Sequence, residues 1–376
     1  MHFLDARDHI EELQSLRGIA ALMVAISHMS SIYVLPSGLR ITIDSVCNAH
    51  ACVIVFFVLS GYVLTGSLIR RGLSWSSVKA FYVGRLFRLF PALWVASAIS
   101  ALFLLLFPEL TIRPALSFWF YLFLHPFPSL TQLILSALAI DKSLIMPVWT
   151  IFIELMGSAI MPVMVAVALA KARLFSWIVL GMGLAAYLLA HAPHRLDSLS
   201  YMFDFALGVW LASRRWQFFD GRSLPTLLGS VFTLIFFRFA YLAIRNGHAT
   251  PLFFGYDDPA PMLIEGLAAF FLVGALASEH GRIRALRSRW AISLGNASYS
   301  LYLIHFPVAI LLAKTLSRVF TNETNAIAAT AILMAAGLTI SLGLASCMYR
   351  FVELPSIALG KRVSSQLVSS HAPMNV

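Results

Sequence analysis

The chain has 376 residues, of which 60% are hydrophobic and 12% are charged, and its mean hydropathy is +0.84. A soluble domain carries about 25% charged residues, so this composition excludes a soluble globular protein and predicts a polytopic helical membrane protein. The net charge of +10 is compatible with nucleic-acid binding. However, the basic residues occupy short loops between apolar segments, which favours membrane topology. The cysteines Cys47, Cys52 and Cys347 have no metal-ligand or redox spacing, and we expect them to be packing residues.

Ten apolar segments are candidate membrane spans, since a span needs about 20 apolar residues. The first is too long for the core of a signal peptide and no small-residue cleavage site follows it, so we expect it to be retained as a helix. The predicted spans are 16–34, 50–69, 89–107, 148–170, 174–191, a shorter one at 199–212, 226–244, 260–278, 297–316 and 326–350.

The charge of the loops predicts the topology. The basic loops 70–88, 213–223 and 279–290 should all lie on the cytoplasmic side. This requires that the segment 117–140 either stays outside the membrane or enters it and returns as a hairpin, because a single crossing would reverse the later loops. The prolines of HPFPS interrupt this segment and disfavour a continuous helix. We therefore predict an all-α transmembrane bundle of about ten spans, with a re-entrant or hairpin segment near 117–140 and both termini in the cytoplasm. The segments predicted to lie outside are 35–49, 108–147, 192–198, 245–259 and 317–325.

The domain organisation predicted from this topology is simple. Residues 1–15 form a cytoplasmic N-terminal segment, residues 16–358 form a single membrane domain, and residues 359–376 form a flexible cytoplasmic tail.

The first span carries two ionisable residues, which are costly inside a bilayer and therefore mark candidate functional positions. Arg17 and His28 are eleven residues apart, close to three full turns, so both side chains share one helix face about 16 Å apart along the axis. In the predicted topology Arg17 lies at the cytoplasmic boundary and His28 lies beyond the membrane centre. The structural alternatives are an arginine that snorkels to the interface and a histidine that only packs between helices.

Two motifs follow on the next two spans. Arg85 and Arg88 are three positions apart, so their guanidinium groups project together at the cytoplasmic mouth. Paired arginines suit a phosphate-rich ligand, although plain positive-inside anchoring is the simpler alternative. Ser60 and Gly61 offer a small surface for close helix approach, which indicates packing first and function second.

The span 148–170 carries Glu154 about two turns from its predicted outer end. Glu154 and His28 therefore enter from opposite sides and reach a similar depth. Such a pair can act as a general base and the carboxylate that orients it, with a buried ion pair as the alternative for the glutamate.

The later spans carry a polar stripe and two further charges. Ser298, Tyr302 and His305 are spaced by four and three residues, so they lie on one helix face, toward the bundle interior. Asp204 and Arg238 are intramembrane charges that we predict to pair with each other.

Taken together and in this order, these residues resemble the acyltransferase-3 family of membrane acyltransferases, from about residue 10 to residue 358. The family patterns are a basic residue and a histidine with ten positions between them, Phe-Phe-x-x-Ser-Gly, Arg-x-x-Arg, Trp-Ser-Leu-x-x-Glu, and Ser-Tyr-x-x-Tyr-Leu-x-His. A sixth is the ending YRFVELP. The corresponding residues are Arg17 and His28; Phe56, Phe57, Ser60 and Gly61; Arg85 and Arg88; Trp149, Thr150, Ile151 and Glu154, with Thr in place of Ser and Ile in place of Leu; Ser298, Tyr299, Tyr302, Leu303 and His305; and 349–355.

The resemblance implies transfer of an acyl group, usually acetyl, from cytoplasmic acyl-CoA to a hydroxyl of a glycan or lipid-linked sugar outside a bacterial cytoplasmic membrane. It implies that His28 is the general base and that Glu154 orients it. It further implies that Arg17, Arg85, Arg88, Ser60 and Gly61 bind the donor, and that Trp149, Tyr299, Tyr302 and His305 line the substrate channel. No metal is expected. The sequence after Glu154 is LMGSAIMP and departs from the family's usual Gln-Phe-Tyr run, so the resemblance extends to the glutamate but does not specify the acceptor contacts after it.

The expected partners are acetyl-CoA as co-substrate, a carbohydrate acceptor and membrane lipids, without nucleic acid. A second copy of the chain and glycan-export machinery are further candidate partners. A covalent acyl-histidine is a mechanistic variant. The main alternative function is a secondary transporter for a sugar, acyl or organic-acid ligand, since buried His, Glu and Arg are common in transporters. No internal repeat of about half the length is found, which weakens that alternative.

Overall fold

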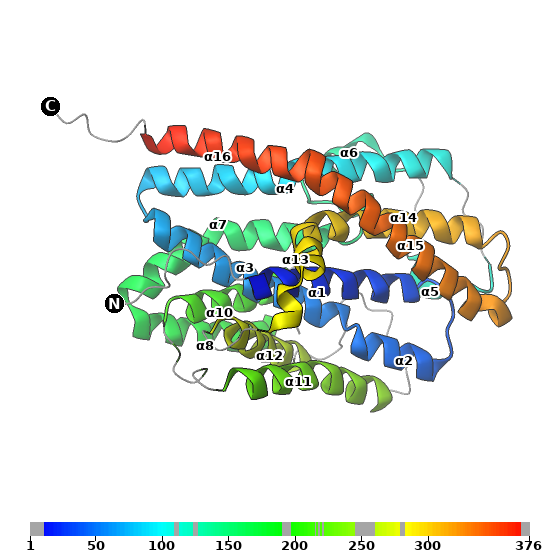
Figure 1. Cartoon of the computed structure of the whole chain (residues 1–376), viewed down its shortest axis with the longest axis horizontal. Helices are drawn as coiled ribbons and strands as arrows, with labels where there is room; N and C mark the ends of the chain where they lie inside the picture. Colours follow the sequence, from blue (N-terminus) through cyan, green and yellow to red (C-terminus); the bar gives the residue numbers. More distant parts are fainter. Residues whose placement is uncertain are drawn as a thin grey trace.

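In a computed structural model the chain is an all-α bundle whose long helices run side by side (Figure 1). The structure describes residues 11–108, 113–122, 127–189, 197–214, 216, 219, 222–244, 260–278 and 283–369. Within these ranges the only extended pairing is an isolated bridge between Tyr33 and Leu116. The predicted fold class, a transmembrane helical bundle, is therefore confirmed.

Sixteen α-helices are described, most of them long enough to reach across the bundle. They are α1 (Glu11–Ser30), α2 (Ser37–Val46), α3 (Ala49–Arg71), α4 (Trp75–Leu106), α5 (Phe118–Tyr121), α6 (Leu130–Ala137), α7 (Val148–Ala170), α8 (Ala172–Leu189), α9 (Asp197–Ser200), α10 (Met202–Ala212), α11 (Ser223–Ile244), α12 (Ala260–Ala277), α13 (Arg289–Asn296), α14 (Ser298–Leu316), α15 (Ala326–Met348) and α16 (Leu354–Ser369). Two 3₁₀ turns (Arg284–Arg287 and Glu323–Asn325) and a π-helix (Tyr349–Glu353) complete the set.

Seven helical stretches in the described part of the chain are long and apolar enough to cross a membrane. They are Ser37–Arg71, Trp75–Leu106, Val148–Ala170, Ser223–Ile244, Ala260–Ala277, Ser298–Leu316 and Glu323–Leu367. The expected count of about ten is not confirmed, and two further apolar helices, Ala172–Leu188 and Ser198–Ala212, are shorter.

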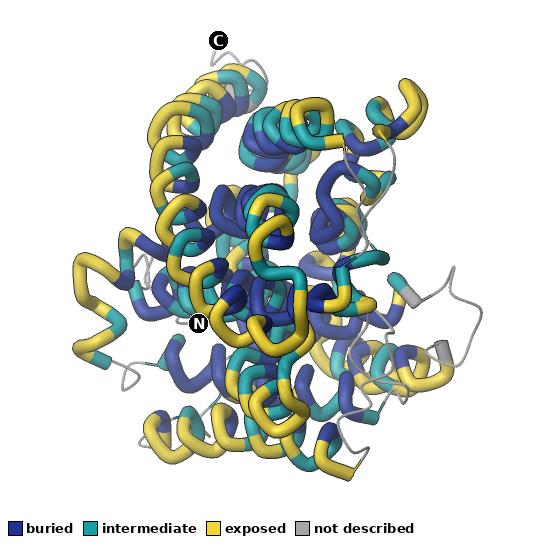
Figure 2. Tube along the Cα trace, turned by 90° about the vertical axis from the view of Figure 1, so that its right-hand side faces the viewer, coloured by how far each residue is buried: buried dark blue, intermediate teal, exposed yellow. Residues whose placement is uncertain are grey.

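The outer surface of the bundle is strongly apolar, as a lipid-facing surface must be. Figure 2 shows buried residues gathered in the interior and exposed residues on the outward faces. Large apolar side chains point outward, with Trp177 72% exposed, Val163 66% and Phe232 63%. A contiguous apolar surface of this kind is stable in lipid and not in water.

Three segments that the sequence analysis placed in loops or a tail are helical. The expected outer loop 35–49 contains α2. Most of the expected cytoplasmic loop 70–88 belongs to α4, because Ser74 caps that helix by accepting a hydrogen bond from the Ser77 amide. Arg85 and Arg88 therefore lie well inside α4 and not at its start.

The expected flexible tail 359–376 is the third segment. Up to Ser369 it is α16, which continues α15 through the π-helix and packs along α4. The Ser364 hydroxyl donates to the Ala80 carbonyl at 3.0 Å. This contact with α4 orders the segment; residues 370–376 lie outside the described ranges.

The interrupted segment 117–140 contains two short helices, α5 and α6, and residues 123–126 between them are outside the described ranges. The segment leading into α5 folds over the end of α1. The Ser117 amide donates to the Ile32 carbonyl at 2.8 Å, and the Val34 amide donates to the Ala115 carbonyl at 3.0 Å. These backbone bonds hold α5 against the C-terminal end of α1.

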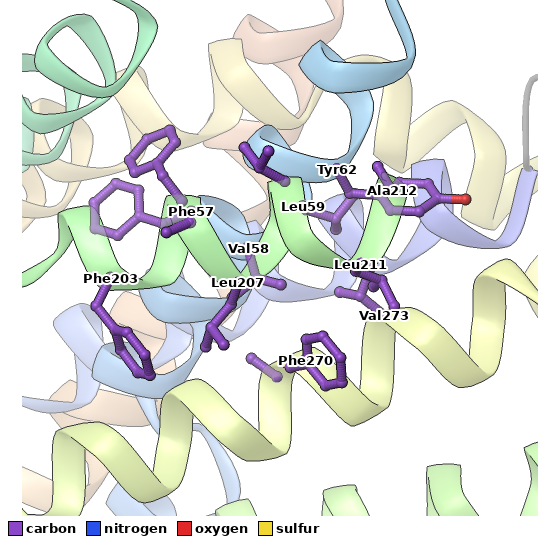
Figure 3. Packing of buried hydrophobic residues seen from close by; sticks show 14 of the residues in the cluster. Phe57, Val58, Leu59, Tyr62, Phe203, Leu207, Leu211, Ala212, Phe270 and Val273 are labelled. Atoms are coloured by element: carbon purple, nitrogen blue, oxygen red, sulfur yellow. The ribbon is translucent and has the colours of Figure 1, made fainter. Parts of the chain in front are cut away.

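The main apolar core lies where α3, α10 and α12 meet (Figure 3). The Phe57 and Phe205 rings stack with their centroids 5.2 Å apart. Gly61 and Gly208 let the backbones of α3 and α10 touch, because a methyl group at Gly208 would overlap the Val58 carbonyl and the Tyr62 amide. Small residues at such crossings are the usual basis of close helix packing in membranes.

We expect Gly208→Ala to lower the free energy of unfolding by about 1–3 kcal/mol, since the added methyl overpacks a backbone contact. The matched change Gly229→Ala meets open space. It should be neutral or stabilise the helix by up to about 1 kcal/mol. Thermal unfolding of both variants in detergent measures the difference, and equal effects of the two would contradict the packing argument.

Candidate active site

Two groups of polar side chains lie at different depths beside α1. The arginine cluster comprises Arg17, Arg85, Arg88, Glu154 and Glu353, whose charges are close enough to act on one another. The histidine pair comprises His28 and His305. Because Arg17 and His28 are eleven residues apart on one helix, the two levels are separated by about 16 Å along α1.

Glu154 binds Arg85, not His28. The Arg85 Nη2 lies 2.5 Å from Glu154 Oε1, and the Arg85 Nε donates to the Ser158 hydroxyl at 3.1 Å. The Ser60 hydroxyl also donates to Glu154, at 3.3 Å. The carboxylate therefore neutralises a largely buried arginine, which is the alternative role considered for it above.

The depth at which α7 begins explains this difference from the sequence prediction. Thr150 near the start of α7 is hydrogen-bonded to the Tyr302 hydroxyl at 2.9 Å, and Tyr302 lies one turn before His305 on α14. The start of α7 is therefore close to the level of the histidine pair. Glu154 is one further turn along α7 and so reaches the arginine cluster.

Arg17 and Arg88 are the available cations of the arginine cluster. Neither guanidinium has a hydrogen-bond or ion-pair partner among the residues that the structure describes. Three arginines face two glutamates, so the cluster carries a surplus of positive charge inside a low-dielectric bundle. Such a surplus favours an anionic ligand.

Glu353 closes the arginine cluster and was not singled out from the sequence. It is 1% exposed and ends the π-helix, a distortion that often occurs at functional sites. Its Oε1 accepts from the backbone amide of Ser300 at 3.0 Å and from the Ser300 hydroxyl, near the N-terminus of α14. Its Oε2 is buried without a hydrogen-bond partner in the described part of the chain. The sequence signal for it was the YRFVELP ending.

The histidine pair is joined by a hydrogen bond of 2.9 Å between His28 Nδ1 and His305 Nε2. His305 Nδ1 lies 3.1 Å from the Leu301 carbonyl, which can only accept, so this nitrogen carries the proton. In neutral His305 the Nε2 is then the acceptor, and His28 must donate from Nδ1. It follows that the lone pair of neutral His28 lies on Nε2, where it is free to take a proton.

Aromatic rings surround the His28 imidazole. The centroid of the Trp119 ring lies 5.6 Å from that of His28, and the Phe306 ring meets His28 edge-on at 6.0 Å. The α5 segment brings Trp119 to this position through its backbone bonds to the end of α1. Neither Trp119 nor Phe306 was predicted as a site residue, because only the folding of α5 over α1 places them together.

The other predicted channel residues lie around these two levels. The Tyr299 hydroxyl donates to the Leu89 carbonyl at 2.8 Å, and Tyr302 is bound to Thr150, so both phenols already have protein partners. Trp149 packs against Tyr201 with centroids 5.5 Å apart. Gly61, assigned above to donor binding, is occupied by the contact with α10 and has no room for a ligand.

The predicted pair between Asp204 and Arg238 is not formed. Asp204 is fully buried, and neither of its carboxyl oxygens has a hydrogen-bond partner in the described ranges. A separate polar network lies near it: the Glu265 carboxylate is 2.5 Å from His50 Nδ1 and accepts from the side-chain nitrogen Nδ2 of Asn48 at 2.6 Å. This network links α3 to α12, and its residues were missed because nothing in their spacing indicates that they meet.

No set of three or more His, Cys, Asp and Glu side chains in the described part of the chain is arranged to hold a metal ion.

Removal of one partner from the Arg85–Glu154 pair should destabilise the protein. We expect Glu154→Ala to lower the free energy of unfolding by about 3 kcal/mol, because it leaves a buried guanidinium without its counter-charge. The double change Arg85→Met with Glu154→Met should recover most of this loss, since no uncompensated charge remains. Thermal unfolding in detergent is the measurement. A double variant less stable than Glu154→Ala would contradict the ion-pair role.

Comparison with known proteins agrees with this arrangement of polar residues in a helical bundle. A family model described as an acyltransferase domain matches residues 10–346. Nodulation protein 10 of Rhizobium leguminosarum bv. viciae is 36% identical over 115 residues, and these cover 30% of this chain and 30% of that relative. No solved structure matches the chain. Because the family match extends from the start of α1 into α15, the chain belongs to the acyltransferase-3 family of membrane acyltransferases.

Proposed function

We propose that the protein transfers a short acyl group, acetyl above all, from acyl-CoA bound at the arginine cluster to a carbohydrate hydroxyl, with His28 as the general base. The observation that carries this proposal is the hydrogen-bond chain from His28 through His305 to the Leu301 carbonyl. It leaves an unprotonated Nε2 on a half-buried imidazole.

The reaction needs a base because a thioester is already activated and the acceptor hydroxyl is not. His28 Nε2 takes the proton of the hydroxyl while its oxygen attacks the thioester carbonyl carbon. The new C–O bond forms, the C–S bond breaks, and the CoA thiolate leaves with the proton from the imidazolium. The base is thus regenerated in each cycle.

His305 takes the positioning role that the sequence analysis gave to Glu154. By accepting the Nδ1 proton of His28, it fixes both the tautomer and the orientation of the ring. When Nε2 gains a proton, the positive charge is stabilised through the same bond, which the Leu301 carbonyl polarises further. A neutral histidine suits a low-dielectric site, where a second carboxylate is costly.

The donor would lie along α1. CoA carries its phosphates at one end and the thioester at the end of a thin arm. Arg17 and Arg88, which form no direct hydrogen bond or ion pair in the described ranges, would bind the phosphates. The arm would then extend over the three turns that separate Arg17 from His28.

The orientation in the membrane follows from the basic residues at the same end as the arginine cluster. Arg70 and Arg71 end α3, and Lys171 lies between α7 and α8. By the positive-inside rule, the arginine cluster would then face the cytoplasm of a bacterial cell and the histidine pair would face the outside. The acceptor would approach from the outer side, where the flat Trp119 ring beside His28 offers a surface for a sugar ring.

Substitutions in the histidine pair test the base. We expect His28→Ala to lower the transfer rate from acetyl-CoA by about 10²–10⁴-fold, the usual contribution of a general base. His305→Ala should also lower the rate, because the His28 ring loses its acceptor. His305→Gln should retain more activity, because its amide oxygen can accept the same proton.

The matched control is His50→Gln, which changes a histidine of the separate network and should leave the transfer rate close to that of the wild type. Each variant is first checked for folding by thermal unfolding in detergent. Folded His28→Ala with wild-type activity would show that another group is the base. Labelled ligand that accumulates in vesicles without covalent product would favour the transporter instead.

Substitutions in the arginine cluster test the donor site. We expect Arg17→Ala and Arg88→Ala each to raise the Kd for acetyl-CoA by about tenfold or more, in line with the loss of a charge-assisted phosphate contact. The effect should shrink as ionic strength rises. Calorimetry gives the Kd, and Arg350→Ala, which removes a basic residue that lies over Phe351, serves as the control. An unchanged affinity in both variants would refute phosphate binding by the cluster.

A further inference from the structure

An open-sided cavity lies next to the histidine pair. Including its mouth it encloses about 480 Å³, between the C-terminal half of α4, residues 142–146 and α14. Most of its lining is apolar, including Phe103, Leu104 and Ile310. Lys142, an exposed residue, also lines it, so the cavity opens to the surface. The proposed mechanism does not use this space.

Phe306 is the side chain that the cavity and the histidine pair share. It lines the cavity, and its ring also meets the His28 imidazole edge-on, at 6.0 Å and 84°. It is 5% exposed and also contacts the Trp119 ring at 6.2 Å. The Phe306 ring therefore stands as a wall between the proposed reaction centre and this mainly apolar, open-sided cavity.

The space at His28 on the inner side of this wall is narrow. His305, Trp119 and Phe306 place their ring centroids 5.2, 5.6 and 6.0 Å from that of His28. A methyl group beside the thioester carbonyl can fit among three rings, but a longer chain needs a path away from the imidazole. The position of the Phe306 ring offers such a path, because this ring both contacts His28 and lines the cavity.

We propose that Phe306 sets the acyl-chain length of the donor, by closing the cavity to the acyl group and so restricting transfer to short chains. This inference rests on the proposed acyl transfer at His28. The chemistry of the lining supports it, because most of the side chains around the cavity are apolar and favour methylene groups over sugar hydroxyls. The polar exceptions are Ser100, Lys142, Ser143 and Lys314.

The test is the choice of donor by the purified full-length protein with a fixed carbohydrate acceptor. We expect wild-type protein to transfer acetyl much faster than octanoyl. In Phe306→Ala the ratio of octanoyl to acetyl transfer should rise about tenfold or more, since each methylene accommodated in an apolar pocket is worth about tenfold or more. Calorimetry with octanoyl-CoA gives the same comparison as a change in Kd.

Two further variants make the test specific. Phe103→Ala enlarges the cavity without removing the wall, so it should leave the ratio unchanged. Ile310→Trp added to Phe306→Ala refills the cavity and should return the ratio toward the wild-type value. If Phe306→Ala does not fold, Phe306→Leu removes part of the wall and should shift the ratio in the same direction.

The outcomes separate this inference from the function on which it rests. Unchanged donor preference in folded Phe306→Ala, with acetyl transfer retained, would overturn the role of Phe306 and leave the acyltransferase mechanism intact. A changed KM for the acceptor without a changed octanoyl-to-acetyl ratio would assign the cavity to the acceptor and overturn the inference. Absence of acyl transfer from every CoA ester by the wild type would refute both.

Discussion

The membrane interior offers no water to a buried polar group, and this constraint organises the site. Every buried charge must find a protein partner, neutralise itself or await a ligand. Arg85 finds Glu154 at 2.5 Å, and His28 finds His305 at 2.9 Å. Arg17 and Arg88 differ from these groups, because within the described part of the bundle neither guanidinium is hydrogen-bonded or directly ion-paired, although Glu154 and Glu353 are close enough to act on their charge. Their charge is the strongest reason to expect an anionic donor.

Helix α1 alone sets the separation between the arginine cluster and the histidine pair. Arg17 and His28 share a face of α1, so the rigid backbone fixes the distance between the proposed anion site and the proposed base. Glu353, at the end of the π-helix, belongs to the arginine cluster and accepts a hydrogen bond from the Ser300 amide near the start of α14. The same helix α14 carries His305. The arginine cluster and the histidine pair are therefore linked through α14 as well as α1. A shift of either helix at the arginine cluster would also move the histidine that this helix carries.

Small residues and aromatic residues have complementary packing roles in this bundle. Gly61 and Gly208 bring α3 and α10 into backbone contact, and the Phe57–Phe205 stack fills the space beside them. The network of Asn48, His50 and Glu265 then ties α3 to α12. These contacts are structural, and they leave the polar interior beside α1 for chemistry.

Composition and hydropathy were sufficient to predict a helical membrane protein, because burial in lipid demands apolar residues whatever the order of the helices. The residue patterns were also sufficient for the family, and for the shared face of Arg17 and His28, since a helix of known pitch fixes that geometry locally. Helix boundaries were less certain: a run of basic residues indicated a loop at 70–88, yet Ser74 caps a helix that includes Arg85 and Arg88.

The partners of the site residues were decided only by the tertiary structure. Sequence spacing cannot tell how deep α7 begins, and that depth determines that Glu154 meets Arg85 while His305 meets His28. It also cannot show that α5 folds over α1, which brings Trp119 to His28, or that Phe306 divides the imidazole from a cavity. Periodicity specifies the face of one helix, but contacts between helices depend on their relative depth and rotation, which packing alone sets.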